Sequence, residues 1–417
     1  MILFGIALRS LNSRRVTVIL IVFSIALSVG LFLGVEKVRT GARMSFANTI
    51  SNTDLIVGAR SGGVQLLLYS VFRVGNATNN VSWQSYQDIA ERREVQWIVP
   101  ISLGDSHRGY RVMGTMGEFF DRYKYRDGRG LSFEKGDRFT DLFDAVLGSD
   151  VAEQLGYDVG NPIVIAHGLA SFTKHDDKPF QVSGILKKTG TPVDRTVLVS
   201  LKGIEAIHVD WRRGSKVPGW TVSTERVRRM DLKPKAITAA MIGVKSRLKI
   251  FGLQRAINEY DEEPLLAILP GVALQELWEI VGVAEDALIG VSAMVVATSL
   301  LGMAAMIFSG LNERRREMAI LRAVGAGPST ILWMLMLEAT MLALLGTVFG
   351  LVLLYAGLWF ARPYVDTAFG LYLPINAPTI REFCFLLGVV FAGGLVSIAP
   401  AIRAYVISVG DGMTIKN

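Results

Sequence analysis

The chain has 417 residues, of which 51% are hydrophobic, and its mean hydropathy is +0.38. It is therefore too apolar for an ordinary soluble protein. The net charge of +7 does not indicate nucleic-acid binding, because much of the basic excess flanks apolar runs, where membrane orientation explains it. The single cysteine, Cys384, lies in an apolar run, so no intramolecular disulfide is possible. One membrane domain and one large water-exposed domain are expected.

The first segment, residues 1–15, is basic, and its apolar residues predict a helix lying on the cytoplasmic membrane surface. The uncharged run that follows predicts a first membrane span over 16–36. A signal peptide is the alternative. Its apolar core would be shorter, however, and residues 32–36 do not fit a small-x-small cleavage site. We therefore expect an uncleaved span with its N-terminus in the cytoplasm.

Residues 37–284 predict a large extracytoplasmic α+β domain. Their many basic residues are no objection, because long translocated domains do not obey the charge rule. The domain's expected strands are short β-rich or alternating runs. The clearest lie at 54–59, 95–101, 110–114, 180–186 and 196–200. Further strand–helix–strand patterns lie at 145–166 and 236–269.

An apolar stretch follows the first expected strand of this domain, directly after Gly62-Gly63. Its main members are Leu66, Leu67, Leu68, Tyr69 and Phe72. One interpretation is that these side chains pack in the domain core. The other is an exposed apolar patch that faces a substrate, a carrier protein or lipid.

The last third of the chain predicts three more spans, so the protein would be multi-pass with both termini cytoplasmic. The expected order is a span at 285–311, a cytoplasmic helix at 312–328, a span at 329–360, an outer loop at 361–382, a span at 383–403 and a cytoplasmic tail at 404–417. The expected inner segments hold most of the Arg and Lys that flank the spans, which supports this orientation.

Segment 312–328 combines dense charge with helical periodicity. Its charged residues are Glu313, Arg314, Arg315, Arg316, Glu317 and Arg322. Met318, Leu321 and Val324 recur every three positions and are predicted to share one helical face. Gly325 and Pro328 should end the helix. The alternative interpretation is a basic loop that only sets the topology.

Glu338 lies deep in the third expected span. An ionisable residue there is costly and is by default a candidate functional residue. It could instead accept a buried hydrogen bond from a hydroxyl of a neighbouring span. The candidate donors are Thr298, Ser299, Ser309 and Ser397.

The sequence lacks the usual motifs of catalysis. It has no G-x-x-x-x-G-K-[ST] phosphate loop, no H-E-x-x-H and no C-x-x-C. Ser149 lacks the second glycine of a nucleophile elbow. His167 and His175, with Asp176 and Asp177, have a spacing that matches no specific metal site, so no metal is predicted. We expect a non-catalytic chain without a cofactor of its own.

Four features together resemble the MacB/FtsX-like permeases of ABC transporters, the group that includes the lipoprotein-releasing LolC and LolE. The first is the layout of one span, a large outer domain and three further spans. The second is the run from Glu313 to Ala326, similar to the family's ER-x-x-E-x-(A/G)-(I/L)-L-R-A-x-G-A. The third is the glycine-rich run 337–351 with Glu338, and the fourth is Pro400-Ala-Ile-Arg-Ala404. The tail departs from the pattern, because Gly410-Asp-Gly412 stands where such permeases often carry Asp-Pro.

This resemblance implies a MacB-type periplasmic core domain and a location in the bacterial inner membrane. It implies a dimer, of one chain or of two different permeases, bound to a cytoplasmic ATPase that holds ATP and Mg²⁺. The helix at 312–328 would be the coupling element of this mechanotransmission, and an adaptor or carrier protein could join outside. Two functions stay open: export or release of a hydrophobic or lipid-anchored substrate, or an FtsX-like signalling scaffold that transports nothing.

Overall fold

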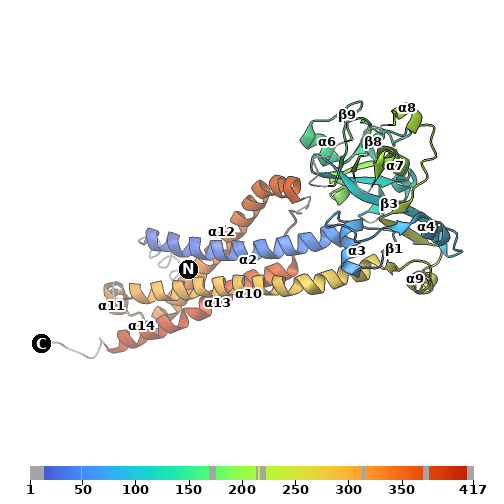
Figure 1. Cartoon of the computed structure of the whole chain (residues 1–417). Coiled ribbons are helices and arrows are strands. Elements are labelled where there is room, and N and C mark those ends of the chain that lie inside the picture. The colour runs from blue at the N-terminus through green and yellow to red at the C-terminus, as the bar shows by residue number, and fades with distance from the viewer. Residues whose placement is uncertain are drawn as a thin grey trace. The chain divides into compact units, whose positions relative to one another are not determined.

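The computed structural model describes residues 14–47, 49–126, 128–168, 175–212, 215–216, 222–311, 315–369 and 375–410. The chain divides into two compact units (Figure 1). One consists of long apolar helices, and the other is a mixed α+β domain formed mainly by Ala42–Val281.

Four stretches among the described residues are helical, long and apolar enough to cross a membrane: Arg15–Met44, Pro270–Gly310, Ser329–Val365 and Ile380–Ala404. Each exceeds the roughly 20 residues that a bilayer requires. The helices that contain or connect them are α2 (Arg15–Ala47), α10 (Pro270–Gly310), α11 (Arg315–Ala323), α12 (Pro328–Phe369), α13 (Ile380–Val396) and α14 (Ile398–Gly410).

Helix α12 differs from the expected pattern, in which a loop begins at residue 361. It continues through Pro363 and ends at Phe369. A proline inside a helix removes one N–H donor and crowds the carbonyl four residues earlier, which favours a bend at that point. Helix α13 begins with a capping box, in which Thr379 and Glu382 each accept a hydrogen bond from the other's backbone N–H.

Small residues allow α12 to approach α2 closely. A Cβ atom added to Gly346 would lie 2.7 Å from Cβ of Ile25, and one added to Gly350 would lie 2.7 Å from the Ala26 carbonyl oxygen. Gly346 and Gly350 form a G-x-x-x-G pattern, which is typical of tight helix contacts in membranes. A Cβ on Gly393 of α13 would likewise lie 2.5 Å from Cβ of Ala343 in α12.

The α+β domain is organised around a mixed sheet, which has eleven strands within the described residues. Its main path is β17-β1-β16-β3-β4-β12-β8-β11-β7, with β10 paired to β3 and β9 paired to β11. The bounds are β1 (Leu55–Ala59), β3 (Val95–His107), β4 (Tyr110–Thr115), β7 (Phe133–Gly136), β8 (Asp144–Leu147), β9 (Pro162–Ile163), β10 (Ala166–His167), β11 (Phe180–Leu186), β12 (Thr196–Ser200), β16 (Ala239–Val244) and β17 (Leu265–Ile268).

Short strand pairs and helices complete the domain. The pairs are β2 (Val81–Ser82) with β15 (Ala236–Ile237), β5 (Lys124–Tyr125) with β6 (Arg129–Gly130), and β13 (Trp211–Arg212) with β14 (Ser215–Lys216). The helices are α3 (Gly63–Ser70), α4 (Trp83–Ala90), α5 (Glu118–Arg122), α6 (Ser149–Leu155), α7 (Leu201–His208), α8 (Thr224–Val227) and α9 (Ile250–Asn258). The expected strands at 180–186 and 196–200 are confirmed with the same bounds.

Strand β3 is the longest of the described strands. Over its 13 residues it pairs with β16, β4 and β10. Two of its buried side chains, Val99 and Ile101, enter the largest core cluster, while Val95 enters another. The strand therefore contributes side chains to two hydrophobic clusters, as β1 and β16 also do.

Candidate functional site

A short helix between two candidate spans carries a buried methionine that packs against their ends. Met318 of α11 is only 5% exposed. Its cluster brings together residues from α11, α12, α14 and the end of α10. The buried members are Leu311, Met318, Ile331, Leu335, Ala401 and Ala404. Because Met318 is packed among three other helices, a displacement of α11 would be transmitted to them.

The end of α11 is formed by local backbone geometry. The amide of Val324 donates to the Ile320 carbonyl oxygen, and that of Gly325 donates to the Arg322 carbonyl oxygen. Gly325 has a φ of +95°, which favours glycine and stops the helix. Pro328 then begins α12, at a helical position where its missing N–H costs little.

The side of α11 away from Met318 is apolar and exposed. Ala319, Ile320, Ala323 and Val324 are all exposed, with Ile320 at 58% and Val324 at 82%. Ala323 follows Ile320 by three positions and Ala319 by four, so these three residues share one face of α11. Val324, whose amide bonds to the Ile320 carbonyl oxygen, continues that face, and we call the four residues the α11 strip. The prediction that Val324 shares a helical face with Met318 is wrong, because Val324 follows the last helical residue and is exposed, whereas Met318 is buried.

Most of the charged candidates fall outside what can be described in atomic detail. Glu313 and Arg314 lie outside the described residues. Arg315, Arg316, Glu317 and Leu321 lie within α11, with side chains outside the described part. Arg322 is half-buried. The guanidinium of Arg403, from the Pro400–Ala404 motif, lies over the Phe308 ring at 5.7 Å from its centroid.

Glu338 is buried within α12, with 7% of its surface exposed. Three of its four candidate donors bond elsewhere. Thr298 donates to the Met294 carbonyl oxygen, Ser397 donates to that of Gly394, and Ser299 meets the Ser24 hydroxyl. Both interpretations of Glu338, a functional ionisable group and a structural acceptor, stay predictions.

A buried group of ion pairs joins α2, α10 and α13, and the sequence analysis did not identify it. Arg39 makes two hydrogen bonds to Glu36, of 2.8 and 3.0 Å, and lies 3.8 Å from Glu285. Lys37 pairs with Glu382 at 3.0 Å, and both are less than 10% exposed. The only sequence feature that could have indicated these ion pairs is the charged run 36–39 directly after an apolar span. The positions of its partners, far away in the sequence, could not be predicted from residue spacing.

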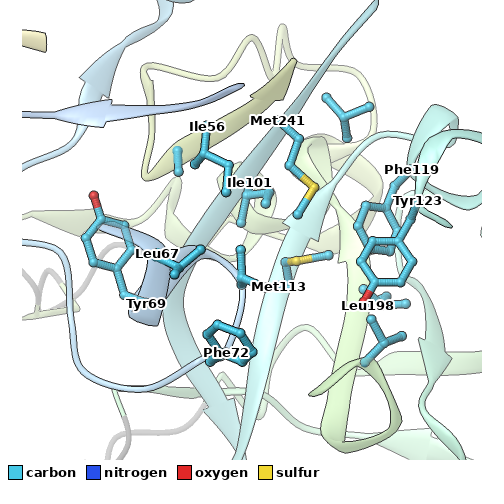
Figure 2. Packing of buried hydrophobic residues seen from close by; sticks show 14 of the residues in the cluster. Ile56, Leu67, Tyr69, Phe72, Ile101, Met113, Phe119, Tyr123, Leu198 and Met241 are labelled. Atoms are coloured by element: carbon cyan, nitrogen blue, oxygen red, sulfur yellow. The ribbon is translucent and has the colours of Figure 1, made fainter. Parts of the chain in front are cut away.

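The segment after the first strand packs in the core, so its interpretation as an exposed, partner-facing patch is wrong. Leu66, Leu67 and Tyr69 are at most 1% exposed. Figure 2 shows Leu67 and Phe72 beside Met113 and Ile101 of the sheet. Leu68 is partly buried against the same cluster. Helix α3 turns these apolar residues toward the strands because an apolar face gains most from burial there.

His167 and His175 lie beside other residues than the two aspartates that the sequence analysis considered with them. Asp176 is exposed, and Asp177 pairs with Lys178 at 2.8 Å, so neither joins His167 and His175. The two histidines meet Asp105 and His208 instead. Local spacing could not reveal this, because Asp105 belongs to β3 and His208 ends α7.

Comparison with known proteins assigns two successive parts of the chain to one class of membrane protein. Residues 16–259 match the model of the MacB-like periplasmic core domain, and residues 289–409 match that of the FtsX-like permease C-terminal region. The chain belongs to the MacB/FtsX-like family of ABC transporter permeases. It is thus a multi-pass membrane protein with four candidate spans among its described residues, in a family of non-catalytic permease subunits.

Individual relatives are more distant. An uncharacterized ABC transporter permease of Methanocaldococcus jannaschii is 25% identical over 225 residues, which are 52% of this chain and 51% of that protein. The chain thus spans about half the length of this relative.

Two solved structures are also similar to part of the chain. The periplasmic region of MacB from Actinobacillus actinomycetemcomitans has a TM-score of 0.35 at 11% identity, covering 55% of this chain and 94% of that structure. The extracellular domain of the noncanonic ABC-type transporter YknZ from Gram-positive bacteria has a TM-score of 0.30 at 12% identity, covering 52% and 100%.

Proposed function

We propose that this chain is the membrane subunit that couples a separate cytoplasmic ATPase to its extracytoplasmic domain. The ATPase holds ATP and Mg²⁺, and this chain contributes no catalytic group. Two permease copies work together in the bacterial inner membrane, with both termini cytoplasmic. The outer domain acts on a hydrophobic or lipid-anchored substrate, with an adaptor or carrier protein as a further partner.

One observation supports this proposal above the others. Met318 packs α11 against the neighbouring helices, while the α11 strip, on the other face of the helix, is exposed to solvent. An exposed apolar strip is typical of a protein-binding surface. A contact there moves a helix that is packed against α10, α12 and α14. Docking and mechanical transmission are therefore combined in α11 and the residue that follows it.

A docking test uses Ile320→Glu, which adds charge to the α11 strip without touching Met318. The full-length chain is purified from its own membranes, and the bound ATPase is quantified by mass spectrometry. We expect at least a tenfold loss of ATPase, because a charged side chain in an apolar contact has to be desolvated. The control is Leu248→Glu, whose side chain is 94% exposed in the other unit. Equal amounts of ATPase with both variants would contradict docking at α11.

A second variant separates transmission from docking. Met318→Ala removes the buried contact and leaves the α11 strip unchanged. We expect ATPase binding to stay within about twofold of wild type, whereas the substrate-dependent stimulation of hydrolysis falls. If both binding and stimulation are normal, α11 does not transmit motion through Met318.

The transport and signalling hypotheses are distinguished by the membrane composition of cells that lack this chain. Accumulation of one hydrophobic or lipid-anchored molecule in the membrane supports transport. An unchanged membrane composition, with loss of activity of an extracytoplasmic enzyme, supports the signalling scaffold instead. The large outer domain, which runs from Ala42 to Val281, is the feature that supports transport.

A further inference from the structure

Four side chains from separate parts of the α+β domain converge on one point. They are Asp105 on β3, His167 on β10, His175 ahead of β11 and His208 at the end of α7. One ligand atom from each lies within 4.8 Å of the others. The backbone positions two of them, because β10 pairs with β3 so that His167 lies directly opposite Asp105. The amide of His175 donates to the Ile165 carbonyl oxygen at 2.9 Å.

The hydrogen bonds within this cluster are incomplete. Nδ1 of His208 donates to the Ile204 carbonyl oxygen at 2.8 Å, so a neutral His208 ring presents a lone pair at Nε2. Nδ1 of His167 lies 3.2 Å from that Nε2 and also 3.2 Å from Oδ1 of Asp105. One N–H cannot satisfy both acceptors.

Buried polar atoms therefore remain without hydrogen-bond partners among the described residues. They are Oδ1 of Asp105 and both ring nitrogens of His175, a residue with no exposed surface. Native proteins rarely bury such groups without a reason, and an ion that is not part of the chain is one of the recognised reasons.

We propose that Asp105, His167, His175 and His208 bind a zinc ion. With zinc–ligand distances near 2.0–2.1 Å, the ligand atoms of a tetrahedral site lie about 3.3 Å apart. Here Nδ1 of His167 lies 3.2 Å from Nε2 of His208 and 3.2 Å from Oδ1 of Asp105, and the latter two atoms are 3.6 Å apart. A cation at the centre of the cluster accepts all these lone pairs together.

The ligand types and their surroundings favour zinc over a hard cation. Imidazole suits zinc, whereas calcium and magnesium prefer oxygen ligands. The Ile204 carbonyl oxygen orients His208, as outer hydrogen bonds do in zinc sites. The Trp211 ring packs against His175 with the centroids 4.3 Å apart. Burial first, and then His208, lower the pKa of His175 to about 4, which agrees with a neutral ring.

An ion can reach the cluster from solvent. Once it is bound, four protein ligands leave no coordination position open. A cavity of about 440 Å³ is lined by His167, His208 and Trp211 among others. A site with four protein ligands has the form of a structural zinc centre rather than a catalytic one. The metal would tie the end of α7 to β3, β10 and the segment around His175, and so stabilise this part of the domain.

The test uses the full-length protein in detergent, stripped with EDTA and then supplied with ZnCl₂. We expect one zinc per chain by elemental analysis, a higher melting temperature, and an intense visible absorption band when Co²⁺ replaces zinc, as tetrahedral coordination gives. CaCl₂ and MgCl₂ should produce none of these effects. If micromolar free zinc leaves the wild-type chain without bound metal, the proposal is wrong.

Matched variants identify the ligands. His175→Gln and His208→Gln should each lower zinc affinity by about 100-fold and abolish the Co²⁺ band. The control is His107→Gln, a buried histidine on β3 whose ring nitrogens meet the Val164 carbonyl oxygen and the Tyr157 hydroxyl. It should keep wild-type zinc affinity even if it lowers stability. Wild-type affinity in both ligand variants would overturn the site. If a variant does not fold, the wild-type measurements still decide.

Discussion

Two leucines of the α+β domain lie at opposite extremes of solvent exposure. Leu67 has no exposed surface in the largest core cluster, whereas Leu248 is 94% exposed. Leu67→Asp should lower the free energy of unfolding by about 4 kcal/mol, because it buries an unpaired charge. Leu248→Asp should change it by less than about 0.5 kcal/mol. Urea unfolding of the full-length protein, followed by tryptophan fluorescence, measures both. A small effect of Leu67→Asp would mean that α3 leaves the core.

Single residues of the candidate site were only partly predictable from the sequence. Periodicity indicates which residues share a helical face, but not which neighbour that face contacts. It therefore identified Met318 and misassigned Val324, and it gave no reason to single out Ile320. The convergence of Asp105, His167 and His208 was hidden for another reason. It depends on the pairing of β10 with β3, whose residues are about 60 positions apart.

At the level of helices and strands, α12 packs closely against α2 at Gly346 and Gly350. Gly350→Leu should separate α12 from α2, because even a Cβ atom there meets the Ala26 backbone. We expect a melting temperature lower by about 5 °C or more and loss of activity. The control on the same helix is Gly357→Leu, since a Cβ on Gly357 meets nothing within 4 Å. Similar melting temperatures for the two variants would show that the close α2–α12 contact contributes little stability.

Elements with local signals were predicted well. Strands 180–186 and 196–200 are β-rich runs with turn residues between them, and this is sufficient to define their ends. The helical stretch beyond residue 360 was missed because Arg362 and Pro363 resemble the start of a loop. Helix α3 was recognised as an apolar segment, but its burial depends on strands that come later in the chain.

For the whole molecule, orientation is the main expectation that still needs a measurement. In a Cys384→Ala background, Leu248→Cys should react with a membrane-impermeant maleimide in intact cells, and Val324→Cys should not. Both positions are more than 80% exposed, so burial cannot explain a difference. After the cells are opened, both should react. Labelling of Val324→Cys in intact cells would reverse the proposed topology.

The order of strands in the domain also determines when it can be completed during synthesis. Strand β1 lies between β16 and β17, and every one of its residues is buried. Asp54 bonds to Val244, 190 residues later, and Arg60 to Leu265, 205 residues later. At roughly 5–20 residues per second, the partners of β1 emerge about 10–40 s after it does. During that interval its unpaired apolar edge is open to aggregation, so the growing chain should depend on a holding chaperone.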